Sequence, residues 1–159
     1  GKSIAVCGDP EARHGIVLTA SYPAKRMGVK TGMPIWEAKQ HCRDLIIVPA
    51  SYGKYQKYSG YVREVFNDYT DQVESFGLDE AWLDITGSVG VFGSPVKIAK
   101  EISARIKREL GITVSIGVSF NKITAKLGSD YKKPDAITVI EPDTYKQIVY
   151  PLPVGDHFQ

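Results

Sequence analysis

Apolar residues recur at two spacings along this chain, and each spacing predicts one type of element. Short alternating or continuous apolar runs predict strands, and steps of three and four residues predict helices. Gly, Pro and Asn predict where the elements end. The expected strands are 4–7, 16–21, 45–48, 73–76, 81–85, 113–118 and 136–140, and the expected helices are 24–27, 35–42, 52–69, 95–110, 122–131 and 143–149.

Two long helices carry the clearest patterns. In helix 95–110, Ser94 is the expected N-cap, Pro95 occupies the first turn, and Gly111 ends the helix. Helix 52–69 carries a stripe of tyrosines and other large apolar residues at three- and four-residue steps. Such a stripe is compatible with base stacking, but at helical spacing we interpret it as core.

The order of elements predicts an α+β protein with two lobes. Residues 1–51 form a small α/β lobe, and residues 52–150 form a larger domain. From residue 52 the order is α-β-β-α-β-α-β, a ferredoxin-like pattern without its first strand and with one extra helix, 122–131. We therefore expect an antiparallel sheet with helices on one face. Residues 151–159 are expected to begin a linker.

Composition is that of a soluble globular protein. Of 159 residues, 43% are hydrophobic and 24% are charged. The net charge of +2 excludes a uniformly basic coat, but it allows a local basic surface. No apolar run approaches the roughly 18 residues of a membrane span, so we expect no membrane partner and a cytoplasmic location. Cys7 and Cys42 have no metal-type spacing and are expected as buried thiols. The opening GKSIAVCGD suggests a fragment of a longer protein.

The segment SFGLDEAWLDITG, residues 75–87, places two acids between apolar strands. Asp79 and Glu80 can converge only if the backbone turns, which Gly77 permits. Two close carboxylates repel unless a cation lies between them, and Mg²⁺ prefers such oxygen ligands. The alternative is a surface hairpin with two solvated acids. We expect Asp84 to be structural and Trp82 to pack behind the site.

Three motifs resemble the Y-family DNA polymerases, the translesion enzymes related to bacterial DNA polymerase IV. GLDEAWLDITGS resembles the family's central acidic motif, and GVSFNKITAKLGSDYKKPDAITVI, residues 117–140, resembles its Asn-Lys and Lys-Pro motif. GIVLTASYPAKRMGVKTGMPIWEAKQHC, residues 15–42, resembles its fingers segment. The three motifs occur in the family's order. The resemblance implies that residues 1–51 are fingers, residues 52–150 are the palm, and the linker leads to an absent thumb.

The resemblance also implies roles for single residues. Asp79 and Glu80 would be catalytic carboxylates that bind two Mg²⁺ ions in the full-length protein. The family's third carboxylate lies on a first strand that precedes this chain. Thr19 and Tyr22 would hydrogen-bond the incoming triphosphate, and Lys133 would reach its phosphates.

One position departs from the family pattern. The family usually has Arg where this chain has Lys25, although Arg26 follows. Lys cannot make the planar, bidentate contact of Arg. Which of the two residues faces the nucleotide therefore stays open.

Interpretations of these residues without a binding role also stay open. Tyr22 fits a plain strand-to-helix turn, and the lysines before Pro134 fit a solvated loop. Lys122 and Lys126 lie one turn apart on a helix and could approach a DNA backbone, but we interpret them as a solvated face.

Three functions compete. The first is template-directed transfer of deoxynucleotides to a primer 3′-hydroxyl by two-metal catalysis, in DNA damage bypass and repair. Its partners would be primer-template DNA and a deoxynucleoside triphosphate, with a sliding clamp as a further candidate through absent regions. The second is a non-catalytic DNA-repair scaffold. The third is another enzyme with a ferredoxin-like palm, such as a nucleotide cyclase, and the segment Thr19–Tyr22 discriminates against it. We expect the isolated fragment to be inactive.

Overall fold

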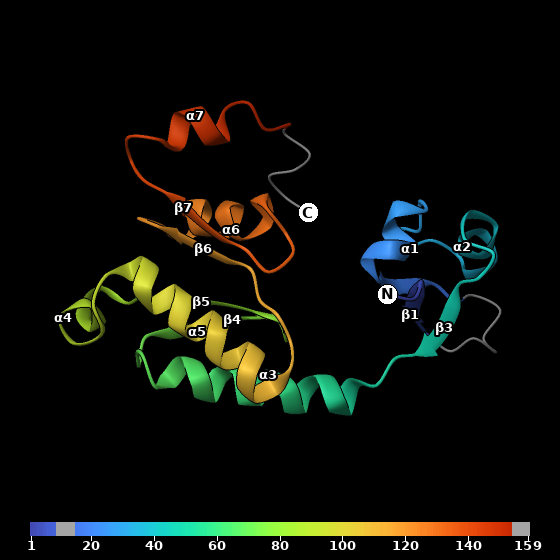
Figure 1. The fold of residues 1–159 in the computed structure, drawn as a ribbon, viewed down its shortest axis with the longest axis horizontal. Coiled ribbons are helices and arrows are strands. Elements are labelled where there is room, and N and C mark those ends of the chain that lie inside the picture. The colour runs from blue at the N-terminus through green and yellow to red at the C-terminus, as the bar shows by residue number, and fades with distance from the viewer. Residues whose placement is uncertain (9–14, 154–159) are drawn as a thin grey trace. The chain divides into compact units, whose positions relative to one another are not determined.

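The structure is a computed structural model, and it describes residues 1–8 and 15–153 (Figure 1). The chain forms two compact units, Gly1–Lys54 and Tyr55–Gln159. The division falls within the first turn of helix α3 (Tyr52–Asn67), a few residues beyond the expected boundary at 51 and 52. The identification of the lobes as fingers and palm stays a prediction, and most of the expected linker 151–159 lies outside the described residues.

The first unit is a three-stranded sheet with two short helices. Strand β1 (Ile4–Cys7) lies in the centre, antiparallel to β2 (Val17–Ala20) and parallel to β3 (Ile46–Pro49). The chain passes from β2 to β3 through α1 (Tyr22–Arg26) and α2 (Ile35–His41). Strand β3 is therefore antiparallel to β2, and this segment carries the chain to the other side of β1, where β3 pairs in the parallel direction.

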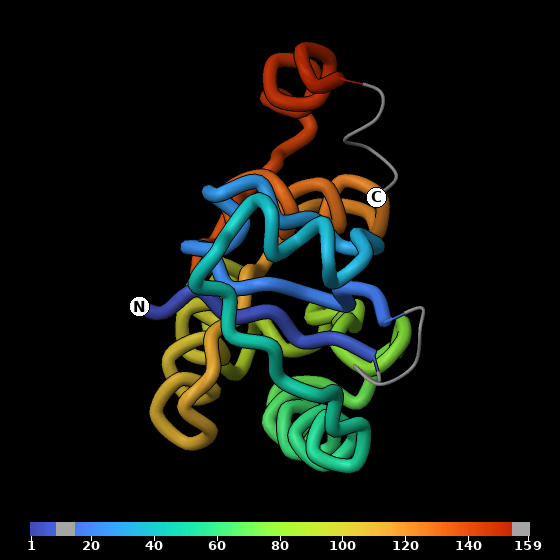
Figure 2. The backbone as a smooth tube through the Cα atoms, turned by 90° about the vertical axis from the view of Figure 1, so that its right-hand side faces the viewer, coloured from blue at the N-terminus to red at the C-terminus, as the bar shows by residue number. Residues whose placement is uncertain are grey.

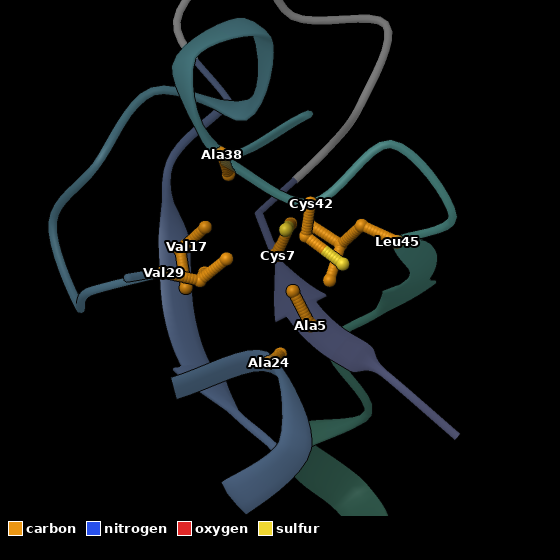
Figure 3. Packing of buried hydrophobic residues seen from close by; sticks show 8 residues of the cluster. All are labelled: Ala5, Cys7, Val17, Ala24, Val29, Ala38, Cys42 and Leu45. Atoms are coloured by element: carbon orange, nitrogen blue, oxygen red, sulfur yellow. The ribbon is translucent and has the colours of Figure 1, made fainter. Parts of the chain in front are cut away.

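Small side chains fill the core of the first unit. Both cysteines are free and buried, as expected, and burial raises the pKa of the Cys7 thiol. They therefore pack as small apolar side chains. Figure 3 shows the buried residues of this core, which are Ala5, Cys7, Val17, Ala24, Val29, Ala38, Cys42 and Leu45.

The second unit contains the two long helices. Helix α3 and helix α5 (Pro95–Leu110) lie side by side in both views (Figures 1 and 2). Their shared core joins Val65 of α3, and Tyr69 just beyond its end, to three residues of α5, namely Ile98, Ile102 and Ile106. The predicted punctuation of α5 is confirmed. The Lys97 backbone N–H donates to Ser94 Oγ at 3.3 Å, and Gly111 adopts the left-handed conformation with φ of 68°.

The tyrosine stripe of α3 is only partly core, so that interpretation was wrong for its first half. Val65 and Tyr69 are buried, but Tyr55 and Tyr58 are 38% and 42% exposed. The pattern is continuous along the helix, yet α5 covers only the second half of it. Helical spacing identifies a face, and what lies against that face depends on the tertiary fold.

The strands of the second unit form two separate pairs in the part of the chain that the structure describes. Strands β4 (Val73–Phe76) and β5 (Glu80–Leu83) are antiparallel, as expected. Strands β6 (Ile116–Ser119) and β7 (Ile137–Ile140) are parallel, and each pair is a sheet by itself. The expectation of one antiparallel sheet was wrong in this respect, because helix α6 (Lys122–Tyr131) makes β6 to β7 a crossover connection.

Short helices complete the second unit. The turn η1 (Thr86–Ser88) and helix α4 (Val89–Phe92) were not predicted, because Gly87 and Gly90 suggest only a break. Helix α7 (Tyr145–Val149) shares a small core with α6 and β7. The α+β class is confirmed.

Candidate active site

The acidic pair lies at a tight turn between two antiparallel strands. Phe76 pairs with Glu80 at the end of the β4–β5 ladder, which leaves only Gly77, Leu78 and Asp79 for the turn. Gly77 has φ of 68°, a conformation that residues with a side chain rarely adopt. The expected backbone turn at Gly77 is therefore present, and it presents the two acids in succession.

The two acids have different surroundings. Asp79 is exposed, whereas Glu80 is half-buried and begins β5. Glu80 Oε1 accepts a hydrogen bond from Lys126 Nζ at 2.6 Å. The carboxylate of Glu80 is thus already balanced by a protein cation, and that of Asp79 faces solvent.

Helix α3 supports the turn from behind. Arg63 Nη2 donates to the Gly77 carbonyl at 2.9 Å, and the Ser59 hydroxyl donates to the Leu78 carbonyl. Ser59 and Arg63 lie one helical turn apart, so both reach the same loop. The two bonds satisfy the two carbonyls that precede Asp79.

Helix α6 supplies the cation, and glycines allow it to lie close to the sheet. The helix begins at Asn121, whose side chain accepts from the Thr124 N–H at 2.9 Å, as predicted. A Cβ on Gly117 would lie 1.8 Å from the Ala125 carbonyl oxygen, and one on Gly128 would lie 3.1 Å from Gly117 Cα. Only glycine at position 117 lets α6 pack this closely on β6.

A chain of four charged groups links Glu80 to Lys133. Beyond its bond to Glu80, Lys126 lies 3.0 Å from Asp130 Oδ2. The other oxygen of Asp130, Oδ1, lies 2.7 Å from Lys133 Nζ. Two acids and two bases alternate, so the group as a whole is neutral.

The pKa values of the central pair are shifted in the directions that favour both charges. Burial lowers the pKa of Lys126, but hydrogen bonds to Glu80 and Asp130 outweigh it and the pKa lies above its ordinary value. Burial raises the pKa of Asp130, but hydrogen bonds from Lys133 and Lys126 leave it below the usual range. Both groups are therefore charged at neutral pH.

Trp82 joins the hairpin to α6 and does not serve only as packing behind the acids. Its indole N–H donates to the Lys122 carbonyl at 3.1 Å, and its ring lies 5.3 Å from that of Phe76. Lys122 Nζ lies 5.1 Å from the indole ring centre and pairs with Glu74. Lys122 is exposed, as the solvated-face interpretation expects, although it pairs with Glu74 of the hairpin. That interpretation was wrong for Lys126, which is mostly covered and bound to Glu80. Asp84 accepts from the Thr86 N–H at 2.9 Å, which fits its expected structural role.

The fingers candidates occupy one strand and the following short helix of the first unit. Thr19 lies on β2 opposite Val6 and is exposed. Tyr22 begins α1 and is 42% exposed, and Lys25 Nζ lies 5.1 Å from the centre of its ring. Arg26 is also exposed. Within this unit Lys25 is thus the basic residue beside Tyr22.

The donor set at the turn fits a divalent cation only in part. Asp79 and Glu80 offer hard oxygen ligands, the type that Mg²⁺ prefers. Residues 1–8 and 15–153 contain no group of three or more acids, histidines or cysteines that could hold a metal. Two carboxylates with substrate phosphates would suit one shared ion.

Among residues 1–8 and 15–153, no helix is long and apolar enough to cross a membrane.

Sequence reasoning missed the residues that hold the site. Ser59 and Arg63 bind backbone carbonyls that are 14 or more residues away, so no motif at the acidic pair predicts them, and Asp130 acts on the pair only through Lys126. The one local signal was the three- and four-residue spacing that joins Lys126, Asp130 and Lys133.

Comparison with solved structures places this geometry among known polymerases. DinB from Sulfolobus solfataricus matches with a TM-score of 0.89 and 35% identity, over 98% of this chain and 46% of that one. A structure described as the insertion ternary complex of Dbh DNA polymerase matches with the same TM-score, identity and coverage.

Curated relatives agree with the structural matches. DNA polymerase IV of Acetivibrio thermocellus is 57% identical over 153 residues, which are 96% of this chain and 38% of that protein. DNA polymerase IV 1 of Bacillus subtilis is 42% identical over 98% of this chain and 37% of its own length. The chain thus spans about two fifths of these relatives.

A family model supports the same relationship. The model described as the impB/mucB/samB family matches residues 1–130. These residues include β2, the β4–β5 hairpin with its acidic pair, and most of α6. The chain therefore belongs to the impB/mucB/samB family, and its resemblance to the Y-family DNA polymerases is confirmed.

Proposed function

We propose that this chain is part of a translesion DNA polymerase, which transfers deoxynucleotides to a primer 3′-hydroxyl during damage bypass and repair. The observation that carries the proposal is the supported turn of the β4–β5 hairpin, which presents Asp79 and Glu80 inside the segment that matches the family. The names of the similar proteins, DNA polymerase IV and Dbh DNA polymerase, support it.

Asp79 and Glu80 are the proposed catalytic carboxylates and metal ligands. Polymerases of the Y family use divalent metal ions, and we propose Mg²⁺, with two ions in the complete protein. Bound ions would supply charge stabilisation for the attacking oxygen and the leaving pyrophosphate. The exposed Asp79 is free of a described cation partner, whereas Glu80 would have to exchange Lys126 for a metal.

The proposed nucleotide-binding residues come from both units. In the first unit, Thr19 and Tyr22 would hydrogen-bond the triphosphate, with Lys25 and Arg26 as its basic neighbours. In the second unit, Lys133 would contact a phosphate as a point charge. The first lobe, residues 1–51, would then be the fingers, and residues 52–150 the palm.

The proposed partners follow from the reaction. They are primer-template DNA and a deoxynucleoside triphosphate, with a sliding clamp as a further candidate, and the proposed location is the cytoplasm with its bacterial nucleoid. We propose that the isolated chain synthesises little DNA, because two carboxylates complete only part of a two-metal site. Robust primer extension by the isolated chain would overturn that statement.

A non-catalytic repair scaffold is the second candidate function. It is favoured by the ion pair that Lys126 makes with Glu80, because a committed structural salt bridge would leave Glu80 unable to bind metal. The two candidates differ in whether the segment supports synthesis.

A segment exchange tests the proposal. This chain would replace the matching 153-residue segment of the Acetivibrio thermocellus relative, which is 57% identical to it. The chimera is expected to extend a primer-template at a rate within about tenfold of the relative, because this chain supplies Asp79, Glu80 and the proposed nucleotide-binding residues and the relative supplies the rest of the polymerase.

The outcomes separate the two functions. A chimera that folds and binds primer-template DNA but makes no product would overturn the polymerase proposal and support the scaffold. The unexchanged relative is the positive control, and thermal melting of both proteins shows whether the chimera is folded.

A further inference from the structure

Asp130 lies in the last turn of α6, between two lysines, in a motif that assigns it no role of its own. Its oxygens are divided between them, with Oδ2 at 3.0 Å from Lys126 and Oδ1 at 2.7 Å from Lys133. Each lysine thus has its own oxygen. A carboxylate that bridges two ammonium groups fixes the separation and the direction of both.

Asp130 and its two lysine partners differ in exposure. The side chains of Lys126 and Asp130 are 25% and 31% exposed, and that of Lys133 is 48% exposed. Asp130 is thus mostly covered, while Lys133 keeps much of its surface accessible. A carboxylate would repel a phosphate, so Asp130 is suited to hold Lys133 and unsuited to bind the nucleotide itself.

The platform beneath Asp130 is well fixed. Helix α6 lies so close to β6 that a Cβ on Gly117 would collide with the Ala125 carbonyl, and Leu127 is buried on the same helix. A side chain on this helix therefore has a defined origin. Lysine, by contrast, is a flexible four-carbon stem that loses much rotamer freedom when it is immobilised.

We propose that Asp130 is a positioning residue for nucleotide binding, which holds Lys133 ready for a triphosphate oxygen and holds Lys126 beside Glu80. The inference rests on the proposed polymerase function. Because Asp130 fixes Lys133 before the nucleotide arrives, binding of the nucleotide does not have to include the entropy loss of immobilising that side chain. The ion pair is a local one that would by itself add little to stability.

Nucleotide binding by the chimera with Asp130→Asn tests the inference. The primer ends in a dideoxynucleotide, so no bond forms and the dissociation constant of the matching deoxynucleoside triphosphate is measured directly. Asn keeps the shape and removes the charge. The dissociation constant is expected to rise about five- to tenfold, with the melting temperature unchanged within a few degrees.

A double-variant cycle identifies Lys133 as the group through which Asp130 acts. In a Lys133→Gln background, Asp130→Asn is expected to weaken binding by less than twofold, because the lysine that it positions is gone. Asp68→Asn is the matched control, since Asp68 also pairs with a basic residue, Arg105, at 2.9 Å. It is expected to leave nucleotide binding unchanged.

Three results would overturn the inference. Nucleotide binding that is unchanged or tighter in Asp130→Asn would contradict it, as would equal effects in the two backgrounds, or a loss of binding that follows a loss of melting temperature. An unsubstituted chimera that neither binds nucleotide nor extends a primer would instead overturn the proposed function, and the inference with it.

Discussion

The β4–β5 hairpin and the β6–α6–β7 unit both position charged side chains of the candidate site, but the hairpin is built from local contacts and the β6–α6–β7 unit from distant ones. The hairpin is local, with a three-residue turn, and its turn residues are exposed. The β6–α6–β7 unit pairs strands about twenty residues apart and packs a helix on them through Gly117 and Gly128. The hairpin carries the proposed catalytic acids, and the β6–α6–β7 unit carries the charges that surround one of them.

An exposed turn can hold catalytic side chains in fixed positions only if other elements support it. The hairpin is supported from two directions, by Ser59 and Arg63 of α3 and by Lys126 of α6. Because a carboxylate misplaced by about 1 Å can cost a hundredfold in rate, the support matters as much as the acids. Loosening either support should therefore lower stability or activity.

The largest expected effect comes from unseating α6. In Gly117→Ala, the new Cβ would lie 1.8 Å from the Ala125 carbonyl oxygen, so the helix must move away from β6. We expect the free energy of unfolding to fall by about 3 kcal/mol or more. Urea denaturation of the chain, followed by circular dichroism, measures it.

Gly60→Ala is the matched control for that variant. Gly60 lies within α3, and a Cβ there would have no neighbour within 4 Å. Alanine should leave stability unchanged or raise it by up to about 1 kcal/mol, because glycine is unfavourable inside a helix. Equal effects of the two substitutions would show that α6 is not seated on Gly117.

The next largest effect is expected when the hydrogen bond from α3 to the turn of the β4–β5 hairpin is removed. Arg63→Met removes the bond to the Gly77 carbonyl but keeps an apolar stem. In the chimera we expect kcat for nucleotide addition to fall about tenfold, because the turn that carries Asp79 loses its fixed position. Arg108→Met, at an arginine that pairs only with Glu109 among the described residues, is the control. Similar rates in both variants would show that α3 does not position the turn.

A smaller effect comes from separating the hairpin and α6 at Trp82. Trp82→Phe keeps an aromatic ring but removes the donor to the Lys122 carbonyl. Thermal denaturation should show that the free energy of unfolding falls by about 1 kcal/mol, the usual net contribution of one hydrogen bond. Trp36→Phe, at a 65% exposed position of the first unit, should change almost nothing. A larger loss at Trp36 than at Trp82 would argue against the link.

The smallest effect concerns pH at the far end of the hairpin. A hydrogen bond from Thr86 lowers the pKa of Asp84 below its ordinary value of 3.8. A lowered folded pKa stabilises the fold above the unfolded pKa, and that contribution is lost as pH falls through the folded pKa. Asp84→Asn should therefore slightly reduce the drop in melting temperature between pH 6 and pH 3. Asp143→Asn is the control, and an equal change there would contradict the assignment.

Local chemistry made much of the fold predictable. Ser94 and Asn121 predicted two helix starts, because each side chain accepts a hydrogen bond from the backbone N–H of the third residue of its helix. Gly77 and Gly111 announced a turn and a helix end because both need positive φ. Helix caps and turn glycines depend only on residues that are close in the chain, so they can be recognised from the sequence alone.

What could not be predicted depends on distant partners. Lys126 and Glu80 are 46 residues apart, and Arg63 reaches a carbonyl 14 residues away. Tyr58 continues an apolar stripe that α5 does not cover. In each case the pattern identified the residue, but the fold decided its partner.

The most direct test of the central claim is the single-turnover rate of the chimera with Asp79→Asn. Asp79 is the exposed acid of the turn, and Asn preserves its size without its charge. The account predicts that nucleotide addition slows by about a thousandfold, while primer-template binding and melting temperature stay the same. A rate within tenfold of the unsubstituted chimera would contradict the assignment of catalysis to this hairpin.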